Sequence, residues 1–189
     1  MAGLLYCALS CIFWRLSAQQ SSERFQAIHD HFAHDPQTGL KAIIAIHNSR
    51  LGPALGGCRY LSYVDEQSAI EDALRLAKGM SYKAALAGVA HGGGKAVIIR
   101  PDHVDNRGAL FEAFGRFIET LNGHYITAMD SGTSSIDMDC IAQHTQHVTS
   151  TTSEGDPSPH TAMGVFTGIR ATAMARLGGD NLEGLRVAI

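Results

Sequence analysis

The sequence predicts an α/β fold, an open, mixed and mostly parallel sheet flanked by helices. Short apolar runs rich in β-branched residues, such as 40–47 and 95–99, are typical of buried strands. Segments whose apolar residues recur at helical spacing, such as 65–80 and 110–121, lie between these runs. Turn signals rich in glycine, proline and asparagine separate the segments. Strands and helices that alternate along a chain favour an open α/β sheet.

Helix and strand signals along the sequence predict five helices and five strands. We expect helices over residues 21–33, 65–83, 110–121, 135–144 and 162–177, and strands over 40–47, 58–63, 95–99, 124–128 and 185–189. Asp65 can cap the second helix, because its carboxylate can accept from a free backbone N–H of the first turn. Thr149 to Thr161 is rich in Ser, Thr, Gly and Pro, so we expect a functional loop or a crossing between domains there.

The composition favours a folded protein that acts on a small molecule. Hydrophobic residues make up 45% of the 189 residues and charged residues only 17%, which is ordinary for a folded soluble domain. The formal net charge is -3 and no Lys/Arg cluster occurs, so we expect neither nucleic acid nor a membrane as a partner. The apolar residues 3–14 are too short to span a bilayer, and their positive charge follows them.

Cysteines and histidines give no metal or disulfide pattern. Cys7, Cys11, Cys58 and Cys140 form no CxxC pair, which favours free thiols in a reducing cytoplasm. Two histidine groups, His29, His31 and His34 and then His144 and His147, fit no standard zinc spacing. We therefore expect no metal, and solvated histidines instead.

A glycine-rich segment precedes the first candidate catalytic residue, Lys95. Gly92-Gly-Gly-Lys95 is not a phosphate-binding P-loop, because Val89 stands where the first glycine belongs and Ala96 follows the lysine. No GxGxxG dinucleotide fingerprint occurs in the sequence. The glycines place Lys95 at the start of a buried strand, where lost hydration makes the neutral amine accessible for proton transfer. By position alone, a solvated lysine at a loop–strand junction is the commoner explanation.

Two further charged residues could join Lys95. Lys83 lies at the end of the long helix, and two lysines that converge on one pocket would suit a substrate with a carboxylate. A cation near a helix C-terminus explains Lys83 equally well. Asp130 comes just after a strand, where sites usually form in α/β sheets, although a cap or turn role is as probable by propensity.

Several segments together resemble one enzyme family. They are Leu51-Gly-Pro-Ala-Leu-Gly-Gly57, Ile70-Glu-Asp-Ala-Leu-Arg-Leu-Ala-Lys-Gly-Met-Ser-Tyr-Lys83, Gly92-Gly-Gly-Lys95, Tyr125-Ile-Thr-Ala-Met-Asp-Ser-Gly-Thr133, Asp156-Pro-Ser-Pro-His-Thr-Ala-Met-Gly-Val165 and Asn181-Leu-Glu-Gly-Leu-Arg-Val-Ala-Ile189. Their order and spacing closely resemble those of the leucine/valine/phenylalanine dehydrogenases, and of the leucine dehydrogenases most. The resemblance extends from about His29 to the last residue and does not include the first 25 residues.

The resemblance implies an activity and a domain organisation. It implies the NAD-dependent oxidative deamination of a branched-chain L-amino acid, leucine or valine, to the 2-oxo acid and ammonia by a cytoplasmic homo-oligomer. Residues 1–25 are then unmatched, 26–161 form the substrate-binding and catalytic domain, and 162–189 form a crossing helix and the first strand of a truncated NAD-binding domain. We expect such a polypeptide to be inactive alone. The alternative is a non-catalytic oligomerisation or interaction module.

The resemblance also implies roles for individual residues. Lys83 corresponds to the family's carboxylate-binding lysine, and Lys95 and Asp130 to its catalytic pair. The implied substrate-binding positions are Gly56, Gly57, Leu55, Met80, Ala128 and Thr149, and Thr161 is implied at the cofactor edge. Met129 stands where the family has a glutamate before the catalytic aspartate, which could alter the electrostatics of Asp130. We expect the Lys95 charge to lower the pKa of Asp130.

Overall fold

The structure, a computed structural model, describes residues 29–188. The chain divides between Glu154 and Gly155 into two compact units, which are described separately. The apolar segment 3–14, Cys7, Cys11 and the part of the first expected helix before His29 lie outside the described residues.

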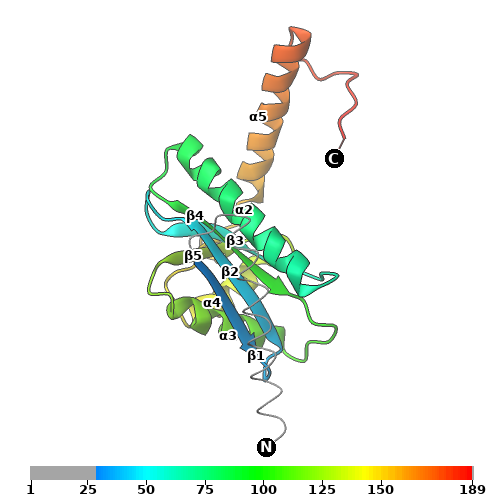
Figure 1. The fold of residues 1–189 in the computed structure, drawn as a ribbon. Coiled ribbons are helices and arrows are strands. Elements are labelled where there is room, and N and C mark those ends of the chain that lie inside the picture. The colour runs from blue at the N-terminus through cyan, green and yellow to red at the C-terminus, as the bar shows by residue number, and fades with distance from the viewer. Residues whose placement is uncertain (1–28, 189) are drawn as a thin grey trace, which may run out of the picture. The chain divides into compact units, whose positions relative to one another are not determined.

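The first unit contains a five-stranded sheet (Figure 1). Its strands are β1 (His29–Asp35), β2 (Leu40–Asn48), β3 (Ala54–Leu61), β4 (Gly92–Ile99) and β5 (Tyr125–Met129). They lie in the order β1-β2-β4-β3-β5. β2 runs antiparallel to β1 and β4, whereas β3 is parallel to β4 and β5. Every strand except β2 therefore has the same direction, which confirms the mixed, mostly parallel sheet.

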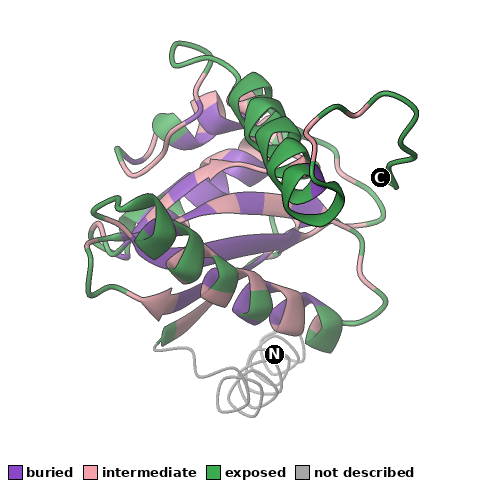
Figure 2. Ribbon diagram, turned by 90° about the horizontal axis from the view of Figure 1, so that it is seen from above, coloured by how far each residue is buried: buried purple, intermediate pink, exposed green. Residues whose placement is uncertain are grey.

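Helices cover both faces of the sheet (Figure 1). The helix α2 (Glu66–Ala87) packs on one face, where Ile43, Ala45 and Val97 of the strands meet its buried alanines, isoleucine and leucine. The helices α3 (Arg107–Glu119) and α4 (Ser135–Ala142) pack on the other face. The central strands β2 and β4 are accordingly mostly buried, whereas the edge strand β1 has no buried residue, and the outward sides of the helices are exposed (Figure 2). The sheet thus has an α2 face and an α3/α4 face.

The long helix α2 begins where the sequence predicts. The Asp65 carboxylate accepts a hydrogen bond of 2.7 Å from the Ser68 backbone N–H, as expected of a helix cap. The helix continues past Lys83 to Ala87 and ends at Gly88, whose φ of 66° is left-handed. Lys83 is therefore one turn inside the helix rather than at its last residue.

The expected helix over residues 21–33 is wrong where it can be tested, because His29–Asp35 is the strand β1. Its side chains alternate between the faces: Phe32 packs toward α2 and Ala33 toward the α3/α4 core. Each residue of β1 pairs with one of β2, as Phe32 does with Ile43. Pairing with an apolar neighbouring strand outweighs a weak local preference for helix.

The glycine-rich segments belong to strands rather than to the turns before them. β3 begins at Ala54 instead of Cys58, and β4 begins at Gly92 instead of Lys95. A Cβ atom on Gly56 would lie 1.8 Å from the Gly94 carbonyl oxygen, and one on Gly92 would lie 2.0 Å from that of Asn48. Close approach of neighbouring backbones, which only glycine permits, explains these glycines without any ligand.

The second unit consists of α5 (Ser158–Leu177) and the residues after it. α5 begins before the expected residue 162, with proline in its first turn. Residues 185–188 form no strand, contrary to expectation, since a strand requires a hydrogen-bonded neighbour and the described part of this unit offers none. The predicted domain boundary after Thr161 stays a prediction.

Among residues 29–188, no helix has the length and apolarity needed to cross a bilayer. In the same range, no three His, Cys, Asp or Glu side chains come close enough together to hold a metal ion. Cys58 and Cys140 are free thiols.

Candidate active site

Lys95 and Asp130 meet on the α2 face of the sheet. Lys95 lies on β4 and is only 5% exposed, and its Nζ donates a hydrogen bond to Oδ2 of Asp130. Asp130 directly follows β5, and its side chain is 24% exposed. The structure therefore brings together two residues that are 35 positions apart in the sequence.

Gly57 makes this contact possible. β3 separates β4 from β5, and Gly57 of β3 pairs with Ala128 and lies level with Lys95. A Cβ atom on Gly57 would lie 2.7 Å from Cβ of Asp130. Because Gly57 has no side chain, Lys95 can reach across β3 to the carboxylate.

Side chains alternate between the two faces along each strand, so each of the other candidate residues on the strands can be assigned to one face of the sheet. Leu55, Gly57 and Ala128 share the α2 face with Lys95, since they lie at alternate positions or in register with it. Gly56 belongs to the opposite face, and its carbonyl accepts a 2.6 Å hydrogen bond from the Tyr125 hydroxyl. Gly56 therefore adjoins the backbone of Lys95, with a Cβ position 3.1 Å from the Lys95 nitrogen, but it does not share the face of the Lys95 side chain.

Met129 also belongs to the opposite face. Its side chain packs against the α3/α4 core, with Sδ 3.9 Å from the Ser135 hydroxyl. Asp130 points to the α2 face, where it contacts Lys95. The uncharged Met129 thus lies across the sheet from the charged pair.

The Asp130 carboxylate is held in its charged form. Burial opposes ionisation, but the hydrogen bond and charge of Lys95 outweigh it and lower the pKa of Asp130, as expected from the sequence. Arg59 of β3 adds to this effect, with Nε 3.4 Å from the same Oδ2 atom. At neutral pH the Asp130 carboxylate is therefore ionised.

Arg59 and Asp72 are the site residues that the sequence analysis missed. Arg59 Nη1 donates to Oδ2 of Asp72 on α2 at 2.8 Å, and that oxygen also accepts from the Tyr63 hydroxyl at 2.9 Å. The signal was the spacing of two residues from Gly57 to Arg59, which puts both on one face of a strand. Asp72 carried no comparable signal.

A tight turn fixes the backbone of Asp130. Its N–H donates to the Thr133 hydroxyl at 2.9 Å, and this hydroxyl oxygen lies 3.0 Å from the Cys58 carbonyl of β3, to which it can donate. Tyr60 N–H donates to the Ser131 carbonyl at 2.9 Å, which ties the turn to β3. Rigid support of this kind is what a proton-transfer group requires.

Lys83 lies on the helix that covers this face, but it is not in contact with Lys95. Its side chain is exposed and has no hydrogen bond or ion pair with any residue between 29 and 188. Lys83 follows Asp72 at a spacing of about three helical turns, so the two share one flank of α2. A Cβ on Gly93 would lie 2.1 Å from the backbone nitrogen of Ser81, so α2 and β4 pack closely just before these two lysines.

The remaining candidates divide between the two units. Met80 is partly buried on α2, and Thr149 follows Val148, with its N–H bonded to the Thr127 carbonyl at 2.9 Å. Thr161 is exposed on α5 in the second unit, where its hydroxyl donates to the Pro157 carbonyl at 3.4 Å.

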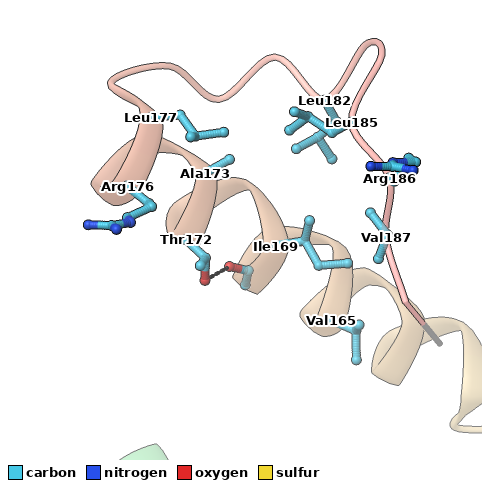
Figure 3. A pocket seen from close by; sticks show the side chains of 11 residues that line it. Val165, Ile169, Thr172, Ala173, Arg176, Leu177, Leu182, Leu185, Arg186 and Val187 are labelled. Carbon is cyan, nitrogen blue, oxygen red and sulfur yellow. Dashed lines mark hydrogen bonds between the residues drawn. The ribbon is translucent and has the colours of Figure 1, made fainter.

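An open apolar groove occurs within the second unit, between α5 and the residues that follow it (Figure 3). Its lining is mostly aliphatic, with Arg176 and Arg186 as the charged members. None of the candidate catalytic or substrate-binding residues lines this groove. The charged pair of the first unit is therefore the better candidate for chemistry.

Comparison with known proteins identifies the family. Residues 23–147 match the family described as Glu/Leu/Phe/Val dehydrogenase, dimerisation domain. The chain belongs to this family. The resemblance noted from the motifs is confirmed.

Individual relatives agree with this assignment. The chain is 55% identical over 162 residues to a leucine dehydrogenase of Geobacillus stearothermophilus, covering 84% of this chain and 44% of the relative. It is 48% identical over 160 residues to a valine dehydrogenase of Streptomyces virginiae, covering 82% and 44%. Among solved structures, an L-tryptophan dehydrogenase from Nostoc punctiforme matches with a TM-score of 0.68 and 41% identity, covering 87% and 47%. The chain thus spans less than half the length of the curated relatives that it matches.

Proposed function

We propose that this chain is the substrate-binding and catalytic part of an NAD-dependent amino acid dehydrogenase, which converts leucine or valine to the 2-oxo acid and ammonia. The buried pair of Lys95 and Asp130 carries the proposal. A buried amine beside a fixed carboxylate can give and take protons without bulk water. The leucine and valine dehydrogenases among the relatives support this choice of substrate.

Lys95 and Asp130 would act in the hydrolytic half of the reaction. Lys95 acts here in its neutral form, after releasing its own proton to solvent. When water adds to the imine carbon of the oxidised substrate, the Lys95 amine accepts the proton that the water loses. The proton then passes from Lys95 to the substrate nitrogen, and as the C–N bond breaks and ammonia leaves, Lys95 accepts the hydroxyl proton of the carbinolamine, so that the carbonyl of the 2-oxo acid forms. Asp130 holds the Lys95 amine in place and balances its charge during these transfers.

Lys83 would bind the substrate carboxylate, and the surrounding positions would form the pocket. Leu55, Gly57 and Ala128 share the face of Lys95, which supports their proposed place beside the substrate. Gly56, Met80 and Thr149 are proposed as further pocket positions. The exposed ammonium of Lys83 has no carboxylate partner in the described part of the chain, so it is free to bind one.

The Lys83 proposal can be tested in a chimera in which residues 29–147 replace the matching region of the G. stearothermophilus leucine dehydrogenase. Lys83→Ala is expected to raise KM for leucine about 10- to 100-fold, because a charged hydrogen bond contributes about 1.5–3 kcal/mol. Lys78→Ala, also on α2, is the matched control and should leave KM unchanged. An unchanged KM in Lys83→Ala would refute the assigned role.

The NAD site itself does not fit the residues present. The sequence contains no glycine-rich dinucleotide turn, and Thr161 bonds to its own helix. We propose that NAD is bound by residues outside these 189, with Thr161 at the edge of that site.

The 189-residue polypeptide alone is accordingly expected to show no dehydrogenase turnover. NADH formation with leucine, valine and phenylalanine measures this, and the chimera serves as the positive control. Steady turnover by the polypeptide alone would show that it holds a complete cofactor site.

A non-catalytic oligomerisation module is the second candidate, because the matched family region is described as a dimerisation domain. We propose a homo-oligomer in the cytoplasm in either case, with neither nucleic acid nor membrane as a partner. Light scattering combined with calorimetry of leucine binding distinguishes the two functions. Assembly without any binding of amino acid would favour the module.

A further inference from the structure

The charged residues of the site form an alternating row rather than an isolated pair. Lys95, Asp130, Arg59 and Asp72 follow one another as cation, anion, cation and anion across β4, β5, β3 and α2. Lys95 and Arg59 bind the same oxygen, Oδ2 of Asp130. The carboxylate therefore has two cationic partners on one atom.

The two cations differ in what they can do. A lysine amine can lose its proton when it is buried, whereas an arginine guanidinium stays charged in proteins. If Lys95 becomes neutral during a reaction step, Arg59 is the one remaining cation in contact with Asp130 among the described residues. Without Arg59, the half-buried carboxylate would then have no counter-charge.

The position of Arg59 is itself fixed. Its guanidinium bridges Asp130 through Nε and Asp72 through Nη1, which a planar fork permits and an ammonium group does not. Asp72 is anchored in turn by the Tyr63 hydroxyl and by Arg75, each within 2.9 Å. Only 20% of the Arg59 side chain is exposed.

We propose that Arg59 is a positioning residue that acts through Asp130: its permanent charge keeps the carboxylate ionised and turned toward Lys95 while Lys95 gives and takes a proton. The inference rests on the proposed role of Asp130 in catalysis. It assigns the mobile proton to Lys95 and not to the carboxylate.

The charged and titratable groups around Asp130 define the expected pH effect. They are Lys95 from β4, Arg59 from β3 and, behind Arg59, Asp72 from α2 with Tyr63. The Lys95 and Arg59 charges lower the pKa of Asp130 against the effect of burial. Loss of the Arg59 charge should therefore raise this pKa, so that the carboxylate protonates at a higher pH as the pH falls.

The test is a carbon-13 NMR titration of the Asp130 carboxyl in the 189-residue chain, assigned with Asp130→Asn. Arg59→Gln is expected to move the midpoint to higher pH, and Arg59→Lys to move it back toward the wild-type value. Arg75→Gln is the matched control, because Arg75 binds Asp72 without touching Asp130. A folded Arg59→Gln chain with an unchanged midpoint would overturn the proposal.

A second measurement needs no folded Arg59 variant. In the wild-type chain, the Arg59 Nε–H resonance should shift with the Asp130 midpoint, and the shift should disappear in Asp130→Asn. An Arg59 Nε–H resonance that does not shift during this titration would contradict the contact between Arg59 and Asp130.

In the chimera, Arg59→Gln should move the acid limb of kcat/KM to higher pH, which a merely structural role would not do. Inactivity of the parent chimera would overturn the proposed function while leaving both titrations unaffected.

Discussion

Lys95→Ala in the chimera is expected to lower kcat by about 10²- to 10⁴-fold, the range that a general acid–base group contributes. The substitution removes the buried amine that accepts the proton of the attacking water. It also leaves a space beside Asp130, so added small amines should restore part of the rate. Steady-state kinetics with and without a primary amine measure both effects.

Lys41→Ala provides the control for this prediction. Lys41 lies on β2 and pairs with Glu66 at 2.7 Å, where both side chains are more than 40% exposed. Exposed pairs of this kind contribute little, so kcat should not change. A Lys95→Ala enzyme that retained the parental kcat would exclude Lys95 from the chemistry.

The same substitution should change the pH dependence of stability. The pKa of Asp130 is lowered in the folded chain, so its ionised form stabilises the fold above the unfolded pKa, and this stability is lost as the pH falls through the folded pKa. Without Lys95, the pKa of Asp130 in the folded chain rises, and the loss of stability with falling pH should begin at a higher pH. Urea unfolding of the 189-residue chain at several pH values records this shift.

Gly56→Ala is expected to destabilise the fold by about 3 kcal/mol or more, beyond the usual cost of overpacking. The new Cβ would lie 1.8 Å from the Gly94 carbonyl oxygen and 2.5 Å from its carbon. These are backbone atoms in the middle of the sheet, so no side chain can move aside. Urea unfolding followed by circular dichroism gives the change in free energy.

Gly79→Ala is the matched control for Gly56→Ala. Gly79 lies in α2, and a Cβ there would meet no atom within 4 Å. Alanine is better than glycine in a helix, so this variant should gain about 0.5–1 kcal/mol. Equal stability of the two variants would mean that β3 and β4 do not approach as closely as described.

Local sequence patterns predicted those strands and helices whose apolar residues are the ones buried in the structure. Residues 40–48 and 66–87 carry continuous apolar runs or helical spacing, and both elements form where expected. Residues 29–35 carry three histidines and two aspartates, so nothing in their composition marks a strand. Their strand conformation depends on β2, a partner that a local pattern cannot identify.

The site was predictable only in part, because its contacts also depend on partners that are distant in the sequence. Lys95 stood out because glycines and a buried strand flank it, but its contact with Asp130 depends on the order of β4, β3 and β5 in the sheet. Arg59 stands 71 residues from Asp130 and 13 from Asp72. No spacing rule connects residues so far apart, and the resemblance did not point to Arg59.

The position of β5 has a consequence for how the chain acquires its fold during synthesis. β5 joins the sheet at its edge beside β3, and Asp130 follows it, so Arg59 and Lys95 leave the ribosome before the anion that binds them both. Until then, closing α2 over the sheet would bury two cations against Asp72 alone, which is costly. We expect a nascent chain to keep α2 loosely attached until β5 has docked, so the last strand both completes the sheet and removes the electrostatic obstacle to closure.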